Sequence, residues 1–341
     1  MHDQLLVALL AIADVRLIAS YTDDQLGFPG DDSIQVFFPD FHLLSAARRA
    51  LFDYGTNNEP ALIQVAAAVL KLKNDAAAAG RHVTVFHIGD YLDLWRESLL
   101  PDLDPAVPDL IKDSHQALVN ILEDPALNTH FLLGNHDFDL YQFAEYNTWE
   151  RRFFIPGDAP SVVVMHGDYF DWVERNAPAE LRDIAVYLFS ENHQAGDALI
   201  GQMRNLSLAC KLADYANFIQ APQPAILGAL QPGGGVPANY NLQTTANSTQ
   251  DGTKFLAAAC QECVNANTAN GTNLRMAIIG HTHHARIATM TMPNGTPFAL
   301  VDTGAWIENC GEANGGQSIP NAQITALSAN QVRIYQLNPH P

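Results

Sequence analysis

An apolar, β-rich run ends directly at a carboxylate motif in the stretch Val83-Thr84-Val85-Phe86-His87-Ile88-Gly89-Asp90-Tyr91-Leu92-Asp93. Other apolar runs end at polar motifs in the same way, and these runs are Ile34–Phe38, His130–Leu133, Ser161–Met165 and Met276–Ile279. Helical patterns separate the early runs, at Ala61–Ala79, which Pro60 precedes and Gly80 follows, and at Asp109–Leu122. Alternating strands and helices predict an α/β fold, with the polar motifs at the carboxyl ends of the strands.

The chain after the last of these motifs has a different pattern. Arg286–Met292 and Phe298–Asp302 flank a connection that contains Asn294-Gly295, which is a strong hairpin signal. Val332–Leu337 alternates as a further strand. These segments predict a second, more antiparallel sheet at this end of the chain.

The polar motifs carry the residue types of a two-metal centre. They are Asp40-Phe41-His42, Gly89-Asp90-Tyr91-Leu92-Asp93, Gly134-Asn135-His136-Asp137, His166-Gly167-Asp168 and Gly280-His281-Thr282-His283. Two divalent cations about 3.5–4 Å apart can clamp a phosphoryl group and activate a water. A carboxylate is a natural bridge between them, and Asp90 is the candidate. Because strand residues two apart project the same way, each Asp-x-His or His-x-His pair is expected to present two ligands together.

Ligand type and charge sharpen this expectation. Histidine, carboxylate and amide ligands suit manganese, iron or zinc better than calcium. Two carboxylates, Asp40 and Asp90, face four positive charges on two divalent ions, so the centre keeps a net positive charge. That charge would hold a phosphate oxygen and lower the pKa of bound water.

With these motifs, the chain resembles the calcineurin-like metallophosphoesterases. The resemblance implies a two-sheet sandwich with helices on both outer faces. It implies two metal sites, one formed by Asp40, His42, Asp90 and His283, and the other by Asp90, Asn135, His166 and His281. It also implies that His136 stabilises or protonates the leaving oxygen and that Asp137 orients His136, since a neighbouring carboxylate raises the pKa of a histidine and fixes its tautomer.

The residues around the motifs are similar to the branch that contains the UDP-2,3-diacylglucosamine hydrolases. The likeness lies in Gly89–Trp95, His166–Asp171, Gly280–Ala285 and Thr303–Cys310. The best-known members of that branch carry arginine where this chain has His136.

Net charge indicates the kind of substrate. The formal charge of the chain is −19, whereas nucleic acids and anionic lipids are bound through clustered lysine and arginine. A small phosphorylated substrate is therefore expected, and nucleic acid is not. The apolar segment Leu5–Ala13 has no positive charge before it and is too short to span a bilayer. We expect an N-terminal helix there, no stable membrane insertion and a cytoplasmic protein of undetermined oligomeric state.

The chain divides into a predicted N-terminal helical extension, residues 1–33, and a catalytic domain, residues 34–341. Residues 169–273 separate the fourth and fifth motifs, with helices expected at Asp183–Leu188 and Leu199–Ile219 and breakers at Ala221–Pro237. Such long connections are often lids or binding elements. Residues 169–273 are therefore predicted to form a helical cap over the metal site, with a passive helical insertion as the alternative.

Several other side chains are candidates for the site. Trp95, Arg96 and His193 are candidate substrate contacts, because arginine matches phosphate geometry and His193 lies in the predicted cap; for Arg96 a surface salt bridge is the alternative. Asp93 and Asp168 are expected to support ligands or cap helices. Cys260 and Cys263 are expected to be reduced and packed, with a local disulfide or an accessory metal site as the alternative.

These features predict a dinuclear metal-dependent phosphohydrolase. It would cleave a phosphoester or pyrophosphate bond, with a UDP-sugar lipid favoured by resemblance alone and manganese as the expected metal, alone or replaced by iron, zinc or a mixture. A phosphodiesterase acting on cyclic nucleotides or other small diesters is the main alternative. A non-catalytic binding scaffold on the same fold is another, and loss of ligands would indicate it; no ligand is missing from this sequence.

Overall fold

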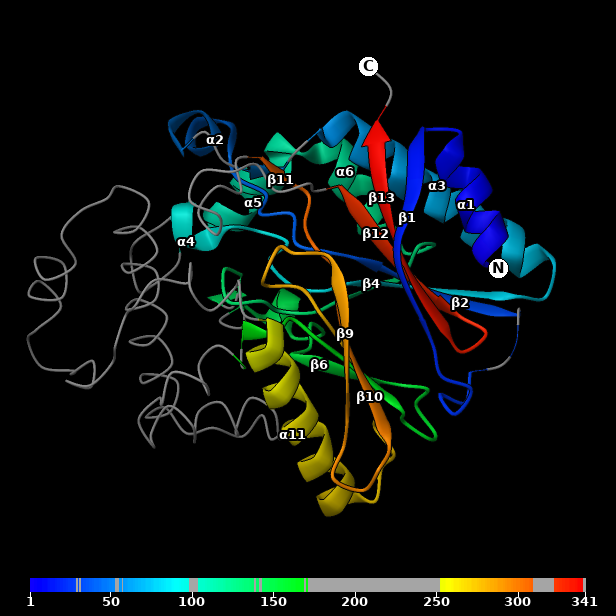
Figure 1. Ribbon diagram of the computed structural model, residues 1–341. Coiled ribbons are helices and arrows are strands. Elements are labelled where there is room, and N and C mark those ends of the chain that lie inside the picture. The colour runs from blue at the N-terminus through cyan, green and yellow to red at the C-terminus, as the bar shows by residue number, and fades with distance from the viewer. Residues whose placement is uncertain are drawn as a thin grey trace, which may run out of the picture.

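The computed structural model describes residues 1–28, 30, 32–52, 55–56, 58–97, 104–137, 139–140, 143–168, 170, 252–308 and 322–339. Within these residues, strands form two large sheets (Figure 1). The first sheet has the order β1 (Ala13–Thr22), β13 (Gln331–Pro339), β12 (Gln323–Ser328), β2 (Ser33–Phe38), β4 (His82–His87) and β5 (Thr129–Phe131). The second has the order β6 (Arg152–Ile155), β7 (Val162–Met165), β8 (Met276–Ile279), β10 (Pro297–Asp302) and β9 (Arg286–Thr291). β3 (Gly55–Thr56) and β11 (Ile307–Glu308) form a separate two-stranded antiparallel sheet.

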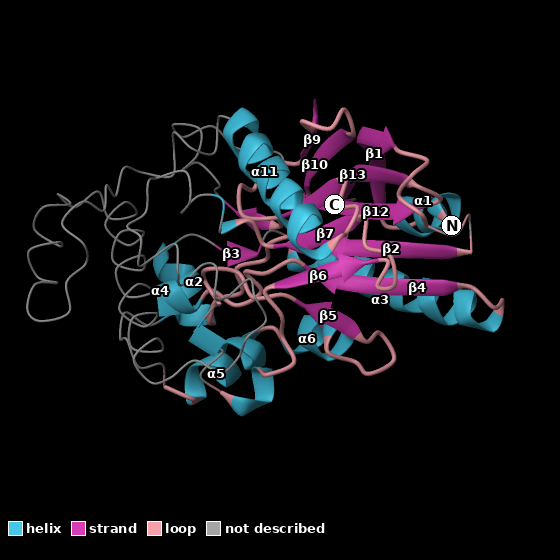
Figure 2. Ribbon diagram, turned by 90° about the horizontal axis from the view of Figure 1, so that it is seen from below, coloured by secondary structure: helices cyan, strands magenta, loops and turns pink. Residues whose placement is uncertain are grey.

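The described helices cover the outer faces of both sheets. Those near the first sheet include α1 (His2–Leu10), α3 (Glu59–Ala78) and α6 (Gln116–Leu122), while α11 (Gly252–Asn270) lies over the second. The other described helices are α2 (Ala46–Phe52), α4 (Leu94–Glu97), α5 (Ala106–Ser114) and the 3-10 turn η2 (Ala144–Tyr146). Figure 2 shows α3 and α6 on one side of the strands and α11 on the other. The α/β sandwich expected from the sequence is therefore confirmed.

Three apolar clusters hold these layers together. One packs α1, α3 and α6 against the first sheet, one lies between the sheets around Phe37, Phe86 and Ile278, and one packs α11 against the second sheet. All six residues of β2 are buried. A strand covered on both faces needs a continuous apolar run, not an alternating one. This is why the runs that precede the motifs identify these strands.

The structure corrects four expectations about elements. The strand predicted at Val332–Leu337 belongs to the first sheet, as β13, and not to a sheet with the β9–β10 hairpin. Its partner β12 is joined to it by a tight turn in which Ala329 and Asn330 both have positive φ angles, as a two-residue hairpin requires. The C-terminal strands are thus divided between the sheets, and both sheets contain parallel and antiparallel pairs.

The predicted helical extension at residues 1–33 is helical only in α1, since β1 pairs along its length with β13 as an edge strand of the first sheet. The single helix predicted at Asp109–Leu122 is two helices that meet at His115. The ring of His115 is buried and donates a hydrogen bond to the carbonyl oxygen of Leu44, 2.7 Å away. This tertiary contact stabilises the interruption between the two helices at His115.

The predicted cap at residues 169–273 lies mostly outside the described residues, including its expected helices and His193. Its last part is α11, whose side chains Phe255, Ala259 and Cys263 pack on the second sheet. Residues 252–270 are therefore a layer of the sandwich and not part of a cap. Both Cys260 and Cys263 are buried free thiols.

Candidate metal centre

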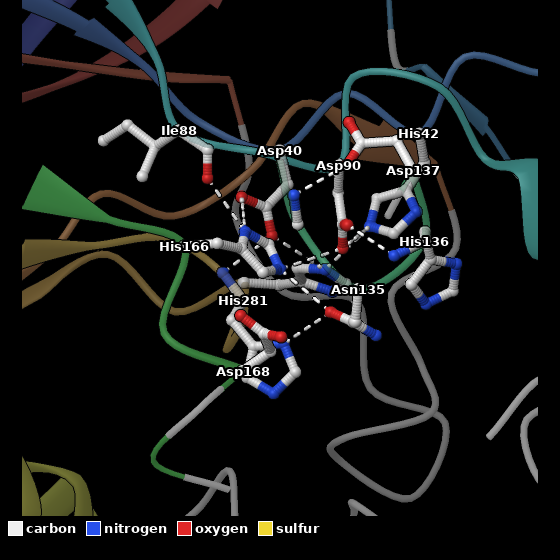
Figure 3. Close-up of polar contacts among 12 residues, drawn as sticks. Asp40, His42, Ile88, Asp90, Asn135, His136, Asp137, His166, Asp168 and His281 are labelled. Atoms are coloured by element: carbon white, nitrogen blue, oxygen red, sulfur yellow. Dashed lines mark hydrogen bonds and ion pairs between the residues drawn. The ribbon is translucent and has the colours of Figure 1, made fainter. Parts of the chain in front are cut away.

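The five motifs meet at one end of the sandwich. Asp40 follows β2, Asp90 follows β4 and Asn135 follows β5, all in the first sheet, while His166 follows β7 and His281 follows β8 in the second. Because the carboxyl ends of parallel strands meet at one edge, segments distant in sequence supply side chains to one cluster (Figure 3). The site therefore spans both sheets.

The backbone, not the strand pleat, aims the paired side chains. Left-handed φ angles occur at His42 (50°), Asp90 (51°), His281 (69°) and His283 (59°), and these residues lie in loops beyond the strands. The expectation that pleat alternation pairs Asp40 with His42 and His281 with His283 is wrong. Aspartate and histidine tolerate this conformation better than most residues, and such outliers cluster at functional sites.

Two glycines let these loops approach one another. A Cβ atom on Gly134 would collide with the Oδ1 atom of Asp90, and one on Gly280 would collide with the Oδ1 atom of Asp40. The glycines of the third and fifth motifs are therefore required by the proximity of the carboxylates.

The first group of possible ligands comprises Asp40, His42 and His283. The Nε2 atom of His283 lies 3.3 Å from Asp40 Oδ2 and 3.1 Å from the Nε2 atom of His42. The Nδ1 atom of His42 donates to Asp93 Oδ2 over 3.0 Å. Burial lowers the pKa of His42 to about 4 and that of His283 to about 3, so both rings are neutral. With its proton on Nδ1, His42 directs the Nε2 lone pair into the site.

The second group centres on His166. Its Nδ1 atom donates to the carbonyl oxygen of Ile88 over 2.8 Å, whereas its Nε2 atom faces Asp90 Oδ2 at 3.1 Å and Asn135 Oδ1 at 3.0 Å. The same Asn135 oxygen lies 3.1 Å from Nδ1 of His281. Asp90 also lies 3.5 Å from Nε2 of His42, so its carboxylate stands between the two groups, as a bridging ligand would.

The cluster has the chemistry of a cation site. When His166 is neutral and its proton is on Nδ1, the lone pair of Nε2 points at the oxygens of Asp90 and Asn135. These three atoms are all acceptors, so no hydrogen bond can form between them. A cation placed among them would bind all three. Asp40 Oδ1 is buried without a hydrogen bond in the described part of the chain, and buried carboxylates are normally paired or bound to metal. The residues present therefore fit one or two divalent metal ions.

Charge in the cluster points the same way. Burial, together with nearby Asp90, raises the pKa of Asp40 to about 6. Burial would lower the pKa of His166, but Asp90 and Asp40 raise it to about 10. Without a metal ion, protons on these groups take the place of the positive charge that the carboxylates require.

His136 lies beside the cluster, and Asp93 holds its ring. The Nδ1 atom of His136 donates to Asp93 Oδ1 over 2.9 Å, and the ring of Trp95 stacks on it with centroids 4.4 Å apart. The guanidinium of Arg96 donates to Asp93 Oδ2 over 2.5 Å. Despite burial, Asp93 and Asp90 raise the pKa of His136 to about 9. The ring is therefore an imidazolium in a fixed orientation.

The prediction that Asp137 orients His136 is wrong. The Asp137 carboxylate accepts hydrogen bonds from the backbone amides of Tyr91, over 2.8 Å, and Gly134, over 2.6 Å. Adjacent side chains on a tight loop point apart, and Asp137 points into the loop. Asp93 also accepts from the amide of Arg96 over 3.1 Å, so it caps α4 as well as supporting the two rings.

Trp95 and Arg96 do reach the site, since both contact His136. Arg96 is buried in its ion pair with Asp93, and this pair is not the surface salt bridge considered as an alternative. Contact of either residue with substrate stays a prediction. His193 lies outside the described residues.

Sequence reasoning missed two supporting groups. Arg151 donates to the carbonyl oxygens of Leu133 and Gly134 and pairs with Asp168. Thr282, between His281 and His283, donates to the buried Asp302. The one local signal in the sequence was Thr282 itself, a polar residue within a ligand motif, and nothing near Arg151 in the sequence indicated its role.

The fold and the site together define an α/β sandwich with a buried aspartate and histidine cluster that could bind metal ions. The calcineurin-like phosphoesterase family matches the chain over residues 36–215, and the chain belongs to this family. The matched segment includes Asp40 through His166, while the structure adds His281 and His283 to the same cluster from outside it. A search of curated proteins found no match.

None of the helices in the described part of the chain is both long and apolar enough to cross a membrane.

Proposed function

We propose that the protein is a dinuclear metal-dependent phosphohydrolase. The observation that carries the proposal is the convergence of His166 Nε2 with the oxygens of Asp90 and Asn135, near the buried Oδ1 of Asp40, which has no hydrogen bond within the described residues. One metal ion would be held by Asp40, His42, Asp90 and His283. The other would be held by Asp90, Asn135, His166 and His281.

Two bound divalent ions would supply Lewis acidity for a phosphoryl oxygen and an activated water. The chain's own residues then have separate tasks. His136 would give a proton from Nε2 to the leaving oxygen, because its Nδ1 proton is donated to Asp93. General acid catalysis of this kind contributes about 10²–10⁴-fold. Arg96 balances the charge of Asp93, and Trp95 fixes the ring plane.

The substrate that fits best is small and phosphorylated. The protein as a whole is strongly acidic, so the metal centre would be a local region of positive charge in an acidic protein. A pyrophosphate bond in a UDP-sugar lipid is the favoured choice, on the likeness of the sequences around the motifs to the UDP-2,3-diacylglucosamine hydrolase branch. Manganese is the favoured metal because the ligands mix imidazole, carboxylate and amide. We also propose that the protein is cytoplasmic.

Substitution of ligands tests the reaction class. Asp90→Ala should abolish phosphoesterase activity with Mn²⁺ supplied, and His136→Ala should lower kcat about 10²-fold or more while bound metal persists. His284→Ala, next to the ligand pair but outside both proposed sets, is the matched control. Full activity in Asp90→Ala, or fewer than one equivalent of metal bound by the reconstituted protein, would contradict the proposal; the second result would favour a binding scaffold.

Product analysis tests the substrate. The protein would be supplied with a UDP-sugar lipid, a cyclic nucleotide and an aryl phosphodiester. Release of UMP from the first supports the favoured substrate. Turnover of the cyclic nucleotide without UMP release would establish a phosphodiesterase instead.

A further inference from the structure

Arg151 lies where the chain crosses from one sheet to the other. Its predecessor Glu150 forms a bridge with Leu132 at the end of β5, in the first sheet. Its successor Arg152 begins β6 and pairs with Met165 at the end of β7, in the second sheet. The backbone of residue 151 is therefore anchored to both sheets within one residue on each side.

The side chain of Arg151 joins the two loops that begin at these strand ends. Its Nη1 atom donates to the carbonyl oxygens of Leu133, over 2.7 Å, and Gly134, over 3.1 Å. Its Nη2 atom donates to Asp168 Oδ2 over 2.6 Å. The arginine side chain is 10% exposed and that of Asp168 is 3% exposed. This is a shielded ion pair, and removal of one partner from such a pair is costly because it leaves a buried charge uncompensated.

Each anchored group is next to a proposed ligand of the same metal ion. The Gly134 carbonyl belongs to the peptide that carries Asn135, and Asp168 follows His166 by two residues. The oxygen of Asn135 and the Nε2 atom of His166 are 3.0 Å apart. A small relative movement of the two loops would separate these atoms, because they come from different sheets.

We infer that Arg151, paired with Asp168, is a positioning residue that sets the geometry of the metal site formed by Asn135, His166 and His281. The inference rests on the proposed function. The planar guanidinium suits this task because its fork holds three acceptors in fixed directions, whereas lysine presents a single ammonium group. The other site has a different support in the described part of the chain, the bond between His42 and Asp93.

The test is a Mn²⁺ titration followed by the electron paramagnetic resonance signal of the free ion. Wild-type protein should bind two equivalents. Arg151→Gln should weaken one equivalent by about 10–100-fold, the range typical of groups that support metal ligands, and leave the other within about twofold. Arg151→Lys should fall between. Arg152→Gln, which removes the same charge one residue away, should bind as wild type does.

Double variants assign the weakened equivalent. Arg151→Gln combined with Asn135→Ala should cause little further loss of Mn²⁺ affinity, since both substitutions act on one site. Arg151→Gln combined with His283→Ala should weaken binding of the remaining equivalent of Mn²⁺. Asp168→Asn should reproduce the selective effect if Arg151→Gln fails to fold. Equal weakening of both equivalents, no weakening, or the same effect from Arg152→Gln would overturn the inference alone. A wild-type protein that binds no Mn²⁺ would overturn the proposed function and this inference with it.

Discussion

The loops after β4 and β5 each place a buried aspartate near His136, and the two aspartates act on different parts of the structure. Asp93 binds side chains, the rings of His42 and His136 and the guanidinium of Arg96. Among the described residues, Asp137 binds only the backbone amides of Tyr91 and Gly134. Their pKa values diverge accordingly: Arg96 and His136 overcome burial and lower the pKa of Asp93 well below its usual range, whereas burial and nearby Asp90 raise that of Asp137 to about 7.

The difference shows that a residue adjacent to His136 in the sequence is not necessarily the residue that orients its ring. Asp137 is next to His136 in the chain but shapes the loop that carries it, while Asp93 comes from another loop and directs the reactive rings. Substitutions of the two should therefore separate activity from stability.

The largest effect is expected from Asp93→Asn. The variant loses the charge that keeps His136 protonated and the acceptor that fixes its orientation, so kcat should fall about 10²-fold or more. Steady-state kinetics with saturating Mn²⁺ would measure it, and circular dichroism would check the fold. A smaller decrease of kcat in Asp93→Asn than in Asp137→Asn would contradict the roles assigned to the two aspartates.

Asp137→Asn should act mainly on stability. An amide can accept from only one of the two backbone N–H groups, and it turns its own N–H₂ toward the other, so a buried donor is left without a partner. The expected loss is about 1–3 kcal/mol in the free energy of unfolding. Chemical denaturation would measure it. Activity assayed well below the melting temperature should change less than in Asp93→Asn.

Asp302 extends the comparison to the second sheet, because it supports the loop between His281 and His283 through Thr282. Burial raises its pKa from 3.8 to about 8, against the effect of Arg286. The folded state then holds a proton that the unfolded state releases, so stability is lost as pH rises from about 4 to about 8. Asp302→Asn should flatten this part of the profile of melting temperature against pH. Asp158→Asn, an exposed carboxylate change, should leave the profile unaltered, and an unchanged profile in Asp302→Asn would refute the assignment.

The smallest effect is expected from Trp95→Phe. A phenyl ring retains most of the stacking on His136, an interaction worth about 0.5–1.5 kcal/mol. We expect kcat within about threefold of wild type, and a larger loss in Trp95→Ala. A tenfold loss in Trp95→Phe would mean that the indole itself contributes to the reaction.

The positions of several strands and the residues of the candidate site could be predicted from local sequence. Continuous apolar runs identified β2, β4, β7 and β8, because strands covered on both faces need such runs, and the polar residues that follow had to meet at one edge. The placement of β13 could not be predicted, since alternation does not say which strand will pair with it. Arg151 gave no local signal either, because its role depends on loops that meet only in the folded chain. The same limit led to the error over Asp137.

The distribution of the cluster over both sheets has a mechanical consequence. Ions bound there would act as a cross-link between two layers that are otherwise held at this end by apolar packing and a few polar bonds. Chelation should then loosen the carboxyl ends of β4 and β7 together, though they belong to different sheets, while the far ends of the same strands stay protected. Amide hydrogen exchange with and without chelator would show whether the metal centre fastens the sandwich as well as serving its chemistry.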